Sequence, residues 1–187
     1  TALPRNATFY NLGVAGATVA GALADQLPEA LRLEPTLVTV WLNVNDLLRL
    51  VSASSYEDDL TGLLTGLRRG GETRVLVANT PPLDRLPVYL ACRAATSATT
   101  PRACPLGEVR SFPGPEAVQA AVGAYNQAVA RAAAAAGAEV VDLHALGLAA
   151  RAGGTEAALV SADGFHPSTA GYQAVAGAFA AALARRP

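Results

Sequence analysis

The sequence predicts an α/β fold, a three-layer α/β/α sandwich built around a parallel sheet. Two features of the 187-residue chain support this prediction. Short apolar runs rich in β-branched residues alternate with longer segments in which apolar residues recur every three or four positions. The short runs are apolar throughout, which is typical of strands buried on both faces, as in parallel sheets. Helices that connect such strands cover the two faces through right-handed crossovers.

Four segments have the strand pattern. Each is an apolar run too short for a helix, and glycine or polar residues follow it. The polar residues matter because ligands of such sheets bind outside the carboxyl ends of the strands. We expect strands at Ala7–Leu12, Leu37–Leu42, Arg74–Ala78 and Glu139–Leu143.

The first predicted helix follows the first of these strands. Val19, Leu23 and Leu27 recur with helical spacing, and the Thr18 hydroxyl can cap the first turn. Pro28 has no N–H to donate, so it is expected to break or restart this helix.

The second predicted helix carries the apolar residues from Tyr56 to Leu67, which share one face. Ser55, with Asp58 three residues later, fits a capping box at its start. Gly70–Gly71 fits the stop, because glycine tolerates the left-handed backbone conformation found after many helices.

The last two predicted helices lie in the second half of the chain. Apolar residues recur with helical spacing over Val118–Val129, before Gly137, and over Tyr172–Leu183, after the capping candidates Ser168 and Thr169. We find no internal repeat or linker, so we expect a single domain over residues 1–187. The chain contains no methionine, and we therefore expect this domain to be N-terminally incomplete.

Charge and composition exclude several classes of function. Charged residues are 16% of the chain, the formal net charge is −1, and adjacent basic residues occur only at Arg68–Arg69 and Arg185–Arg186. A nucleic-acid binder would carry a basic patch, and a single-strand binder would also carry stacking aromatics, which are 5% here. The apolar stretch around Ala132–Ala138 is too short to span a bilayer. We expect neither a nucleic-acid partner nor a membrane span.

The two cysteines, Cys92 and Cys104, lie in the stretch Leu83–Pro115, which we expect to be irregular because it is rich in Pro, Ser, Thr and Arg. Neither belongs to a Cys-x-x-Cys pair or has a histidine near it, so we expect no metal site. A disulfide between them would contribute about 3 kcal/mol in the chain-entropy model. It would also imply an exported protein. The alternative is two buried free thiols.

Asp163 and His166 are the clearest candidates for chemistry. They lie in the loop before the last predicted helix, separated by a glycine and a phenylalanine and followed by Pro167. A turn at the glycine can bring the carboxylate to Nδ1 of the imidazole, and the proline keeps His166 extended. An aspartate that orients a histidine base is two thirds of a nucleophilic triad. The alternative is a turn-capping aspartate beside a surface histidine.

Two further loops, at the exits of the first two predicted strands, are candidates for binding an anion. Asn43–Asp46 places amides where they can donate to a developing oxyanion, although Asn and Asp are also ordinary turn residues. Gly13–Thr18 can offer backbone N–H groups, but it lacks the G-x-G-x-x-G spacing of a dinucleotide site. His144, the second histidine, is expected to be structural.

Taken together, the order and spacing of these motifs resemble the SGNH hydrolases, also called the GDSL esterase/lipase family. Asn11–Thr18 is similar to the family's second block, which implies that the N–H of Gly16 contributes to an oxyanion hole. Asn43–Asp46 is similar to the third block, which implies that the side chain of Asn45 completes that hole.

The resemblance extends over essentially the whole chain. The loop around Asp163 and His166 is similar to the fifth block, which implies that both are triad members, and Val77–Pro82 is similar to the family's fourth strand and its exit. The resemblance implies the flavodoxin-like fold of the family, a five-stranded parallel sheet in the order 2-1-3-4-5.

Two departures from the family pattern stand out. Asn43 replaces the usual glycine of the third block, where it can narrow the acyl site or add a donor. The first block, whose Gly-Asp-Ser carries the nucleophile, is absent, and no serine precedes Ser52. In one explanation, the serine and the first strand lie before Thr1, in a segment that is either cleaved but still associated or left out of this chain. In the other, the protein is a degenerate family member that has lost the serine. We favour the former, because losing a central strand between Ala7–Leu12 and Leu37–Leu42 would leave backbone groups unsatisfied.

The resemblance implies a serine esterase or lipase-type hydrolase of small-molecule carboxylic esters, with no metal or cofactor. His166 would act as general base and then acid, Asp163 would orient it, and the serine would lie outside this chain. The alternatives are a non-catalytic carbohydrate- or acyl-binding pseudoenzyme on the same fold, and a flavodoxin-like domain that binds phosphate or a nucleotide through Gly13–Thr18. The cysteines and the habit of the family lead us to expect a secreted or extracytoplasmic protein.

Overall fold

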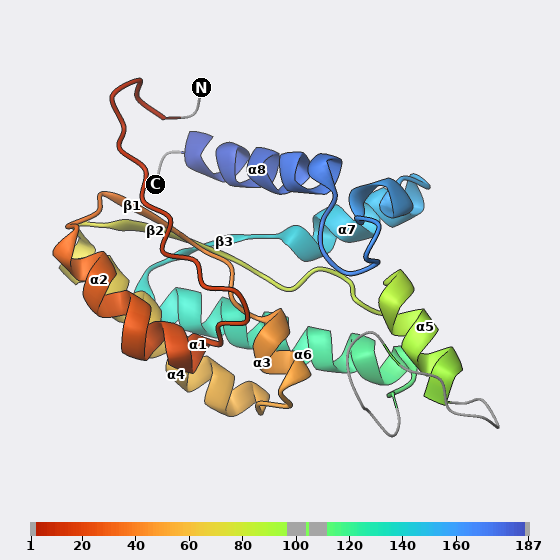
Figure 1. Cartoon of the computed structure of the whole chain (residues 1–187). Helices are drawn as coiled ribbons and strands as arrows, with labels where there is room; N and C mark the ends of the chain where they lie inside the picture. Colours follow the sequence, from red (N-terminus) through yellow and green to blue (C-terminus); the bar gives the residue numbers. More distant parts are fainter. Residues whose placement is uncertain (1–2, 97–103, 105–111, 186–187) are drawn as a thin grey trace. The chain divides into compact units, whose positions relative to one another are not determined.

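A computed structural model describes residues 3–96, 104 and 112–185 of the chain (Figure 1). Within these residues, one parallel sheet has the strand order β1-β2-β3. Leu37 lies opposite Arg74 in the first pair of strands, and Leu76 lies opposite Glu139 in the second. The predicted α/β fold with a parallel sheet is therefore confirmed. The strands are β1 (Leu37–Val40), β2 (Arg74–Ala78) and β3 (Glu139–Val141).

Helices fill the segments between and after the strands. Thr18 caps the first helix as predicted, because its Oγ1 accepts a hydrogen bond from the N–H of Gly21 at 3.2 Å. Pro28 does not interrupt the helix as expected, because the backbone of Gln26 and Leu27 stays helical; a π-helical stretch instead precedes α2, which has Pro28 in its first turn. The helical elements are α1 (Val19–Gly21), the π-helical η1 (Ala22–Gln26), α2 (Leu27–Arg32), α3 (Val44–Leu48), α4 (Ala53–Arg68), the 3₁₀ turn η2 (Arg69–Gly71), α5 (Pro87–Thr96), α6 (Pro115–Ala136), α7 (Leu143–Ala152), the 3₁₀ turn η3 (Glu156–Leu159) and α8 (Thr169–Ala184).

The chain divides into two compact units, and the first contains the sheet. On one face of the sheet, Val75 and Val77 pack with α1, α2, α4 and the second half of α6 into an apolar core. Leu76 and Ala78, which alternate with these valines and point to the other face, are also fully buried, and the end of α8 lies on that side (Figure 1). Burial on both faces explains why β2 is apolar throughout. The unit comprises the described residues of Thr1–Thr80, Ala124–Leu143 and Ala178–Pro187.

Arg74 connects the start of the sheet to the end of α8. Its Nε and Nη2 donate to the two carboxylate oxygens of Glu139 at 2.7 and 2.9 Å. Its Nη1 donates to the carbonyl of Leu183 at 3.0 Å, and its Nη2 also donates to the carbonyl of Ala182 at 3.0 Å. The last carbonyls of a helix have no partner within the helix. One guanidinium therefore satisfies the end of α8 and joins β2 to β3.

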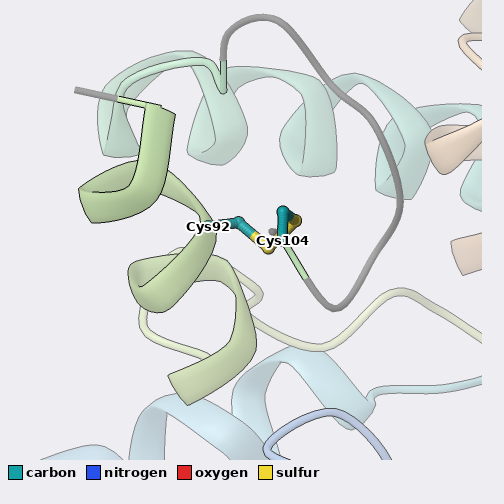
Figure 2. Close-up of a disulfide and its surroundings, with 2 residues drawn as sticks. All are labelled: Cys92 and Cys104. Atoms are coloured by element: carbon teal, nitrogen blue, oxygen red, sulfur yellow. A yellow bond between two sulfur atoms is a disulfide. The ribbon is translucent and has the colours of Figure 1, made fainter. Parts of the chain in front are cut away.

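The second unit comprises Pro81–Gly123 and His144–Gly177. It contains α5, the start of α6, α7 and the start of α8. A disulfide joins Cys92, which is fully buried on α5, to Cys104 (Figure 2). The expected bridge is confirmed, and the alternative of two free thiols is wrong. The expectation of a single domain remains a prediction.

Arg151 on α7 binds two carboxylates of the second unit. Its Nη2 lies 3.0 Å from Oδ1 of Asp84 and 2.7 Å from Oε1 of Glu156. The side chain of Gln119 donates to Oδ2 of Asp84 at 2.8 Å. Burial on its own would raise the pKa of Asp84, but the hydrogen bonds from Arg151 and Gln119 outweigh it and lower that pKa. The loop after β2 is thus held to α7 by a charged pair.

The predicted strand at Ala7–Leu12 is wrong. The segment is irregular, and the side chains of Phe9 and Tyr10 are 82% and 58% exposed. A strand forms only where a neighbour takes its backbone hydrogen bonds, and within the described residues β1 pairs with β2 alone. Apolar composition without a neighbouring strand is not sufficient.

The predicted capping box at Ser55 and Asp58 is also wrong. α4 begins three residues earlier than that box implies, because the Oγ of Ser52 accepts from the N–H of Ser55 at 3.1 Å. The predicted stop at Gly70–Gly71 is confirmed, since α4 ends at Arg68 and a turn follows.

Three helices were not predicted. α5 lies inside the stretch that composition marked as irregular, α7 begins at Leu143, where a strand was expected to end, and α3 occupies the polar loop after β1. The predicted ends of the other helices agree with the structure, including Ser168, whose Oγ accepts from the N–H of Gly171 at 3.1 Å and so caps α8. None of the described helices combines the length and apolar character needed to cross a bilayer.

Candidate functional site

Asp163 and His166 contact each other in the loop between η3 and α8. Oδ2 of Asp163 lies 2.7 Å from Nδ1 of His166. The loop is closed at its base by the N–H of Ser161, which donates to the carbonyl of His166 at 2.8 Å, and by a bridge between Val160 and Pro167. The turn expected from the sequence is therefore present, and it aims the carboxylate at one nitrogen of the ring.

The other carboxylate oxygen of Asp163 accepts three hydrogen bonds. The donors to Oδ1 are the hydroxyl of Ser161 at 2.7 Å and the N–H groups of Phe165 and His166 at 2.8 and 2.9 Å. The hydrogen bond to His166, followed by those from Ser161 and the backbone, holds the pKa of Asp163 well below its usual range. Asp163 is thus an anion at neutral pH, as the orienting member of an Asp–His pair must be.

His166 keeps its second ring nitrogen for other partners. Its side chain is 63% exposed, and within the described residues Nε2 makes no hydrogen bond. The ring of Phe165 meets the imidazole edge to face, with centroids 4.9 Å apart. Since Asp163 occupies Nδ1, the tautomer that donates to Asp163 leaves Nε2 as an acceptor that can take a proton.

Gly164 allows this loop to pack on the first residues of α5. Its φ is +73°, a conformation that glycine adopts without strain. Its carbonyl accepts from the N–H of Val88 at 3.2 Å, and a Cβ at this position would lie only 2.9 Å from the Val88 nitrogen. A larger residue would therefore push the Asp163–His166 loop away from its support.

Gly16 and Asn45, the two candidates for an oxyanion hole, lie in the first unit. The side-chain amide of Asn45 donates to the carbonyl of Ala17 at 2.9 Å. An amide nitrogen carries two hydrogens, so one remains for a ligand. Gly16 has φ +76°, its carbonyl accepts from Arg49 at 3.3 Å, and its N–H makes no hydrogen bond within the described residues. The side chain of Asn45 thus joins its own loop to the backbone of the Gly13–Thr18 loop.

Asp46 strengthens the connection between these loops. Both of its carboxylate oxygens accept from the N–H of Val19, at 3.0 and 3.2 Å. The side chain is 2% exposed, and burial raises its pKa. Asp46 therefore binds the start of α1, immediately after the Gly16 loop, to α3, which carries Asn45.

Asn43, which stands where the third block of the SGNH hydrolases usually has glycine, is 3% exposed. Its side-chain amide donates to the carbonyl of Ala78 at 3.4 Å. Asn43 was expected either to narrow the acyl site or to add a hydrogen-bond donor. The structure shows the added donor, and its acceptor is the backbone carbonyl of Ala78, the last residue of β2.

The structure brings together the members of each pair, Asp163 with His166 in the second unit and Gly16 with Asn45 in the first. His144 lies on α7 rather than at the end of a strand, and its imidazole is half-buried. Within the described part of the chain, no group of three His, Cys, Asp or Glu side chains could hold a metal ion. The sequence analysis did not predict the contact of Ser161 with Asp163. The only sign of it in the sequence is the position of Ser161, two residues before Asp163.

Comparison with known proteins gives one family and several similar structures. The model of a family described as GDSL-like Lipase/Acylhydrolase matches residues 1–174. No curated protein matches the chain. An alpha/beta hydrolase enzyme from the metagenome of Lake Arreo, Spain, is 20% identical with a TM-score of 0.63, over 90% of this chain and 69% of that one.

Two other solved structures are similar over nearly the same residues. The lipase/acylhydrolase from Enterococcus faecalis is 20% identical with a TM-score of 0.64, over 90% of this chain and 71% of that one. A carbohydrate esterase family 3 protein from Talaromyces cellulolyticus is 18% identical with a TM-score of 0.60, over 97% of this chain and 76% of that one. At these identities the likeness shows a shared fold.

Proposed function

The chain belongs to the GDSL-like lipase/acylhydrolase family, and from that membership we propose that it supplies the Asp–His pair and the oxyanion hole of a serine esterase that hydrolyses small-molecule carboxylic esters. The observation that carries the proposal is the contact of 2.7 Å between Asp163 and Nδ1 of His166. The same contact leaves Nε2 of the imidazole available to a nucleophile. Asp163, His166, Gly16 and Asn45 are the residues to which we assign the chemistry.

In the proposed reaction, Nε2 of His166 takes the proton of a serine hydroxyl while the serine oxygen attacks the ester carbonyl carbon. The carbonyl electron pair moves onto oxygen, and the N–H of Gly16 and the amide of Asn45 donate to that oxyanion. Asp163, an anion, stabilises the imidazolium. The bond between the carbonyl carbon and the alcohol oxygen then breaks, and the imidazolium gives its proton to the departing alcohol, which leaves an acyl-serine. Water, whose proton His166 takes, attacks the acyl-serine in the same way, and the bond to the serine breaks to release the acid.

We propose that the serine lies outside these 187 residues, because none of the serines in the chain stands in a Gly-Asp-Ser context. We further propose that the strand that carries this serine pairs with β1. In support, β1 pairs only with β2 within the described residues, and the apolar side chains of Phe9 and Tyr10 are exposed. The similar structures are also longer, since this chain spans 69% to 76% of their length.

A second candidate is a non-catalytic protein of the same fold that binds acyl or carbohydrate groups. The observation that favours it is the same lack of a Gly-Asp-Ser serine in the sequence. Such a protein would keep a pocket for the ester but would show no turnover and no covalent adduct with a serine-directed reagent.

Hydrolysis of a short-chain p-nitrophenyl ester by the full natural protein tests the proposal. We expect turnover in the wild type and a loss of about 10⁴-fold or more in kcat for His166→Gln, since the remaining rate comes from binding and the oxyanion hole. His144→Gln is the matched control, because His144 is the other histidine of the chain, and we expect it to keep wild-type kcat. Equal rates for both variants, or no turnover in the wild type, would exclude the esterase and leave the binding protein.

We further propose that the protein works outside the cytoplasm. The disulfide between Cys92 and Cys104 supports this, because such bonds persist in oxidising compartments. Fractionation of the source cells, followed by non-reducing mass analysis of the protein, tests it.

A further inference from the structure

Ser161 lies two residues before Asp163, and its hydroxyl donates to the carboxylate at 2.7 Å. We propose that Ser161 is a positioning residue that holds Asp163 in the orientation in which Oδ2 faces the imidazole of His166. This inference rests on the proposed function of the Asp163–His166 pair.

The hydrogen bonds of Asp163 are divided unequally between its two oxygens. Among the residues that the structure describes, Oδ1 accepts from Ser161, Phe165 and His166, whereas Oδ2 contacts only Nδ1 of His166. A partial rotation of the carboxylate would move Oδ1 away from its donors and Oδ2 away from the imidazole. The side chain of Asp163 is 51% exposed, so packing contributes little to its orientation and hydrogen bonds must set it. In the described part of the chain, Ser161 supplies the one side-chain donor to Oδ1.

Ser161 is itself held through its backbone. Its N–H donates to the carbonyl of His166 at 2.8 Å, and its carbonyl accepts from the N–H of Gly164 at 3.0 Å. Neither bond uses the hydroxyl. A change of the side chain at position 161 can therefore remove the bond to Asp163 while the loop keeps its backbone connections.

The same geometry distinguishes Ser161 from a nucleophile. A serine nucleophile gives its proton to the histidine base, but the Ser161 hydroxyl donates to Asp163, on the side of Nδ1. The labelling of the full natural protein by a serine-directed phosphonate is therefore expected to persist in Ser161→Ala.

Steady-state kinetics of the full natural protein test the proposal with three variants. Ser161→Ala and Ser161→Val, which both lack the hydroxyl, are expected to lower kcat about tenfold, the equivalent of one hydrogen bond to a charged group, with little change in KM. Ser161→Thr has nearly the shape of the valine variant but keeps a hydroxyl, and it should restore kcat to within about twofold of the wild type. Wild-type kcat in the alanine and valine variants, or equal losses for threonine and valine, would overturn the proposal.

A double-mutant cycle tests whether Ser161 acts through Asp163. In the Asp163→Ala background, Ser161→Ala should have no further effect on kcat, because its partner is already absent. A further tenfold loss in that background would mean that Ser161 acts elsewhere.

A carboxyl titration separates this inference from the proposed function. The ¹³C resonance of the Asp163 carboxyl can be followed with pH in the full natural protein whether or not that protein hydrolyses esters. Removal of a donor to the carboxylate raises its pKa, so Ser161→Ala and Ser161→Val should raise the pKa of Asp163 and Ser161→Thr should not. An unchanged Asp163 pKa in all three variants would sink the inference even if the wild type is an esterase. If the wild type shows no turnover but the Asp163 pKa changes as expected in the three variants, the esterase proposal is excluded and the role of Ser161 stands.

Discussion

The side-chain amide of Asn45 donates to the carbonyl oxygen of Ala17 at 2.9 Å. This bond fixes the amide beside the backbone that follows Gly16, whose N–H makes no hydrogen bond within the described residues. Two donors that are 29 residues apart in the sequence are thereby brought to neighbouring positions before any ligand binds. Donors held in place in advance are the most effective in stabilising a transition-state charge, because they need no reorganisation during the reaction.

Asn45→Ala is therefore expected to lower kcat by about 10²- to 10³-fold, the usual cost of one oxyanion donor, with little change in KM. Asn45→Asp keeps the shape of the side chain but replaces the donor by an anion, and it should lose at least as much. The measurement is hydrolysis of a p-nitrophenyl ester by the full natural protein. A change in KM alone would contradict the oxyanion role.

Gly164→Ala is expected to destabilise the protein by more than about 1 kcal/mol, since the residue has a positive φ and its new Cβ would lie 2.9 Å from the Val88 nitrogen. Gly123→Ala is the control, because nothing lies within 4 Å of a Cβ there and the residue is inside α6. That substitution should be neutral or should stabilise by up to about 1 kcal/mol. Denaturant unfolding of both variants checks the pair, and equal effects would contradict the packing described for the loop.

Arg151→Leu leaves the buried carboxylate of Asp84, 5% exposed in the ion pair, without its charged partner. We expect a loss of about 3 kcal/mol or more in the free energy of unfolding. The double variant Asp84→Leu, Arg151→Leu should recover most of that loss, because the buried charge of Asp84 is gone and the partner that remains, Glu156, is 30% exposed to solvent. If the double variant is as unstable as Arg151→Leu, the cost has another origin.

This ion pair also predicts a dependence of stability on pH. The pKa of Asp84 is lowered in the folded protein, so the unfolded chain binds its proton at higher pH than the folded chain does. The stabilisation is complete above the unfolded pKa of about 4 and is lost as the pH falls through the folded pKa. In unfolding experiments between about pH 6 and about pH 2, the loss of stability on acidification should be smaller in the double variant Asp84→Leu, Arg151→Leu than in the wild type.

Reduction of the disulfide between Cys92 and Cys104 should lower the free energy of unfolding by about 3 kcal/mol, because the bond restricts the unfolded chain. Thermal unfolding with and without reductant measures the loss. A variant with serine at both positions should resemble the reduced protein and should not respond to reductant. A response of that variant would point to a different effect of the reductant.

The sequence was sufficient where the determining contacts are local. β2 was predicted because each face of its apolar run is buried, and the turn that joins Asp163 to His166 was predicted from the spacing of two residues around a glycine. Ala7–Leu12 has the same local pattern as a strand but no neighbouring strand in the described residues. The error there shows that pairing, which is not local, decides the outcome.

The contacts that the sequence did not predict are long-range or lack a distinctive pattern. Arg151 and Asp84 are 67 residues apart, and no periodicity connects them. α5 contains residues whose composition suggested a loop, and its disulfide and the packing of Val88 on Gly164 stabilise it instead. Ser161 is one serine among many, and only its distance of 2.7 Å from Asp163 distinguishes it.

The proposed esterase needs a serine outside these 187 residues, to which this chain supplies the base and the oxyanion donors. Mass mapping of the adduct formed by a serine-directed fluorophosphonate with the full natural protein locates that serine. We expect a single adduct on a serine outside these residues, and much slower labelling in His166→Gln than in His144→Gln. An adduct on a serine within this chain, or no adduct on an intact and folded protein, would contradict this proposal.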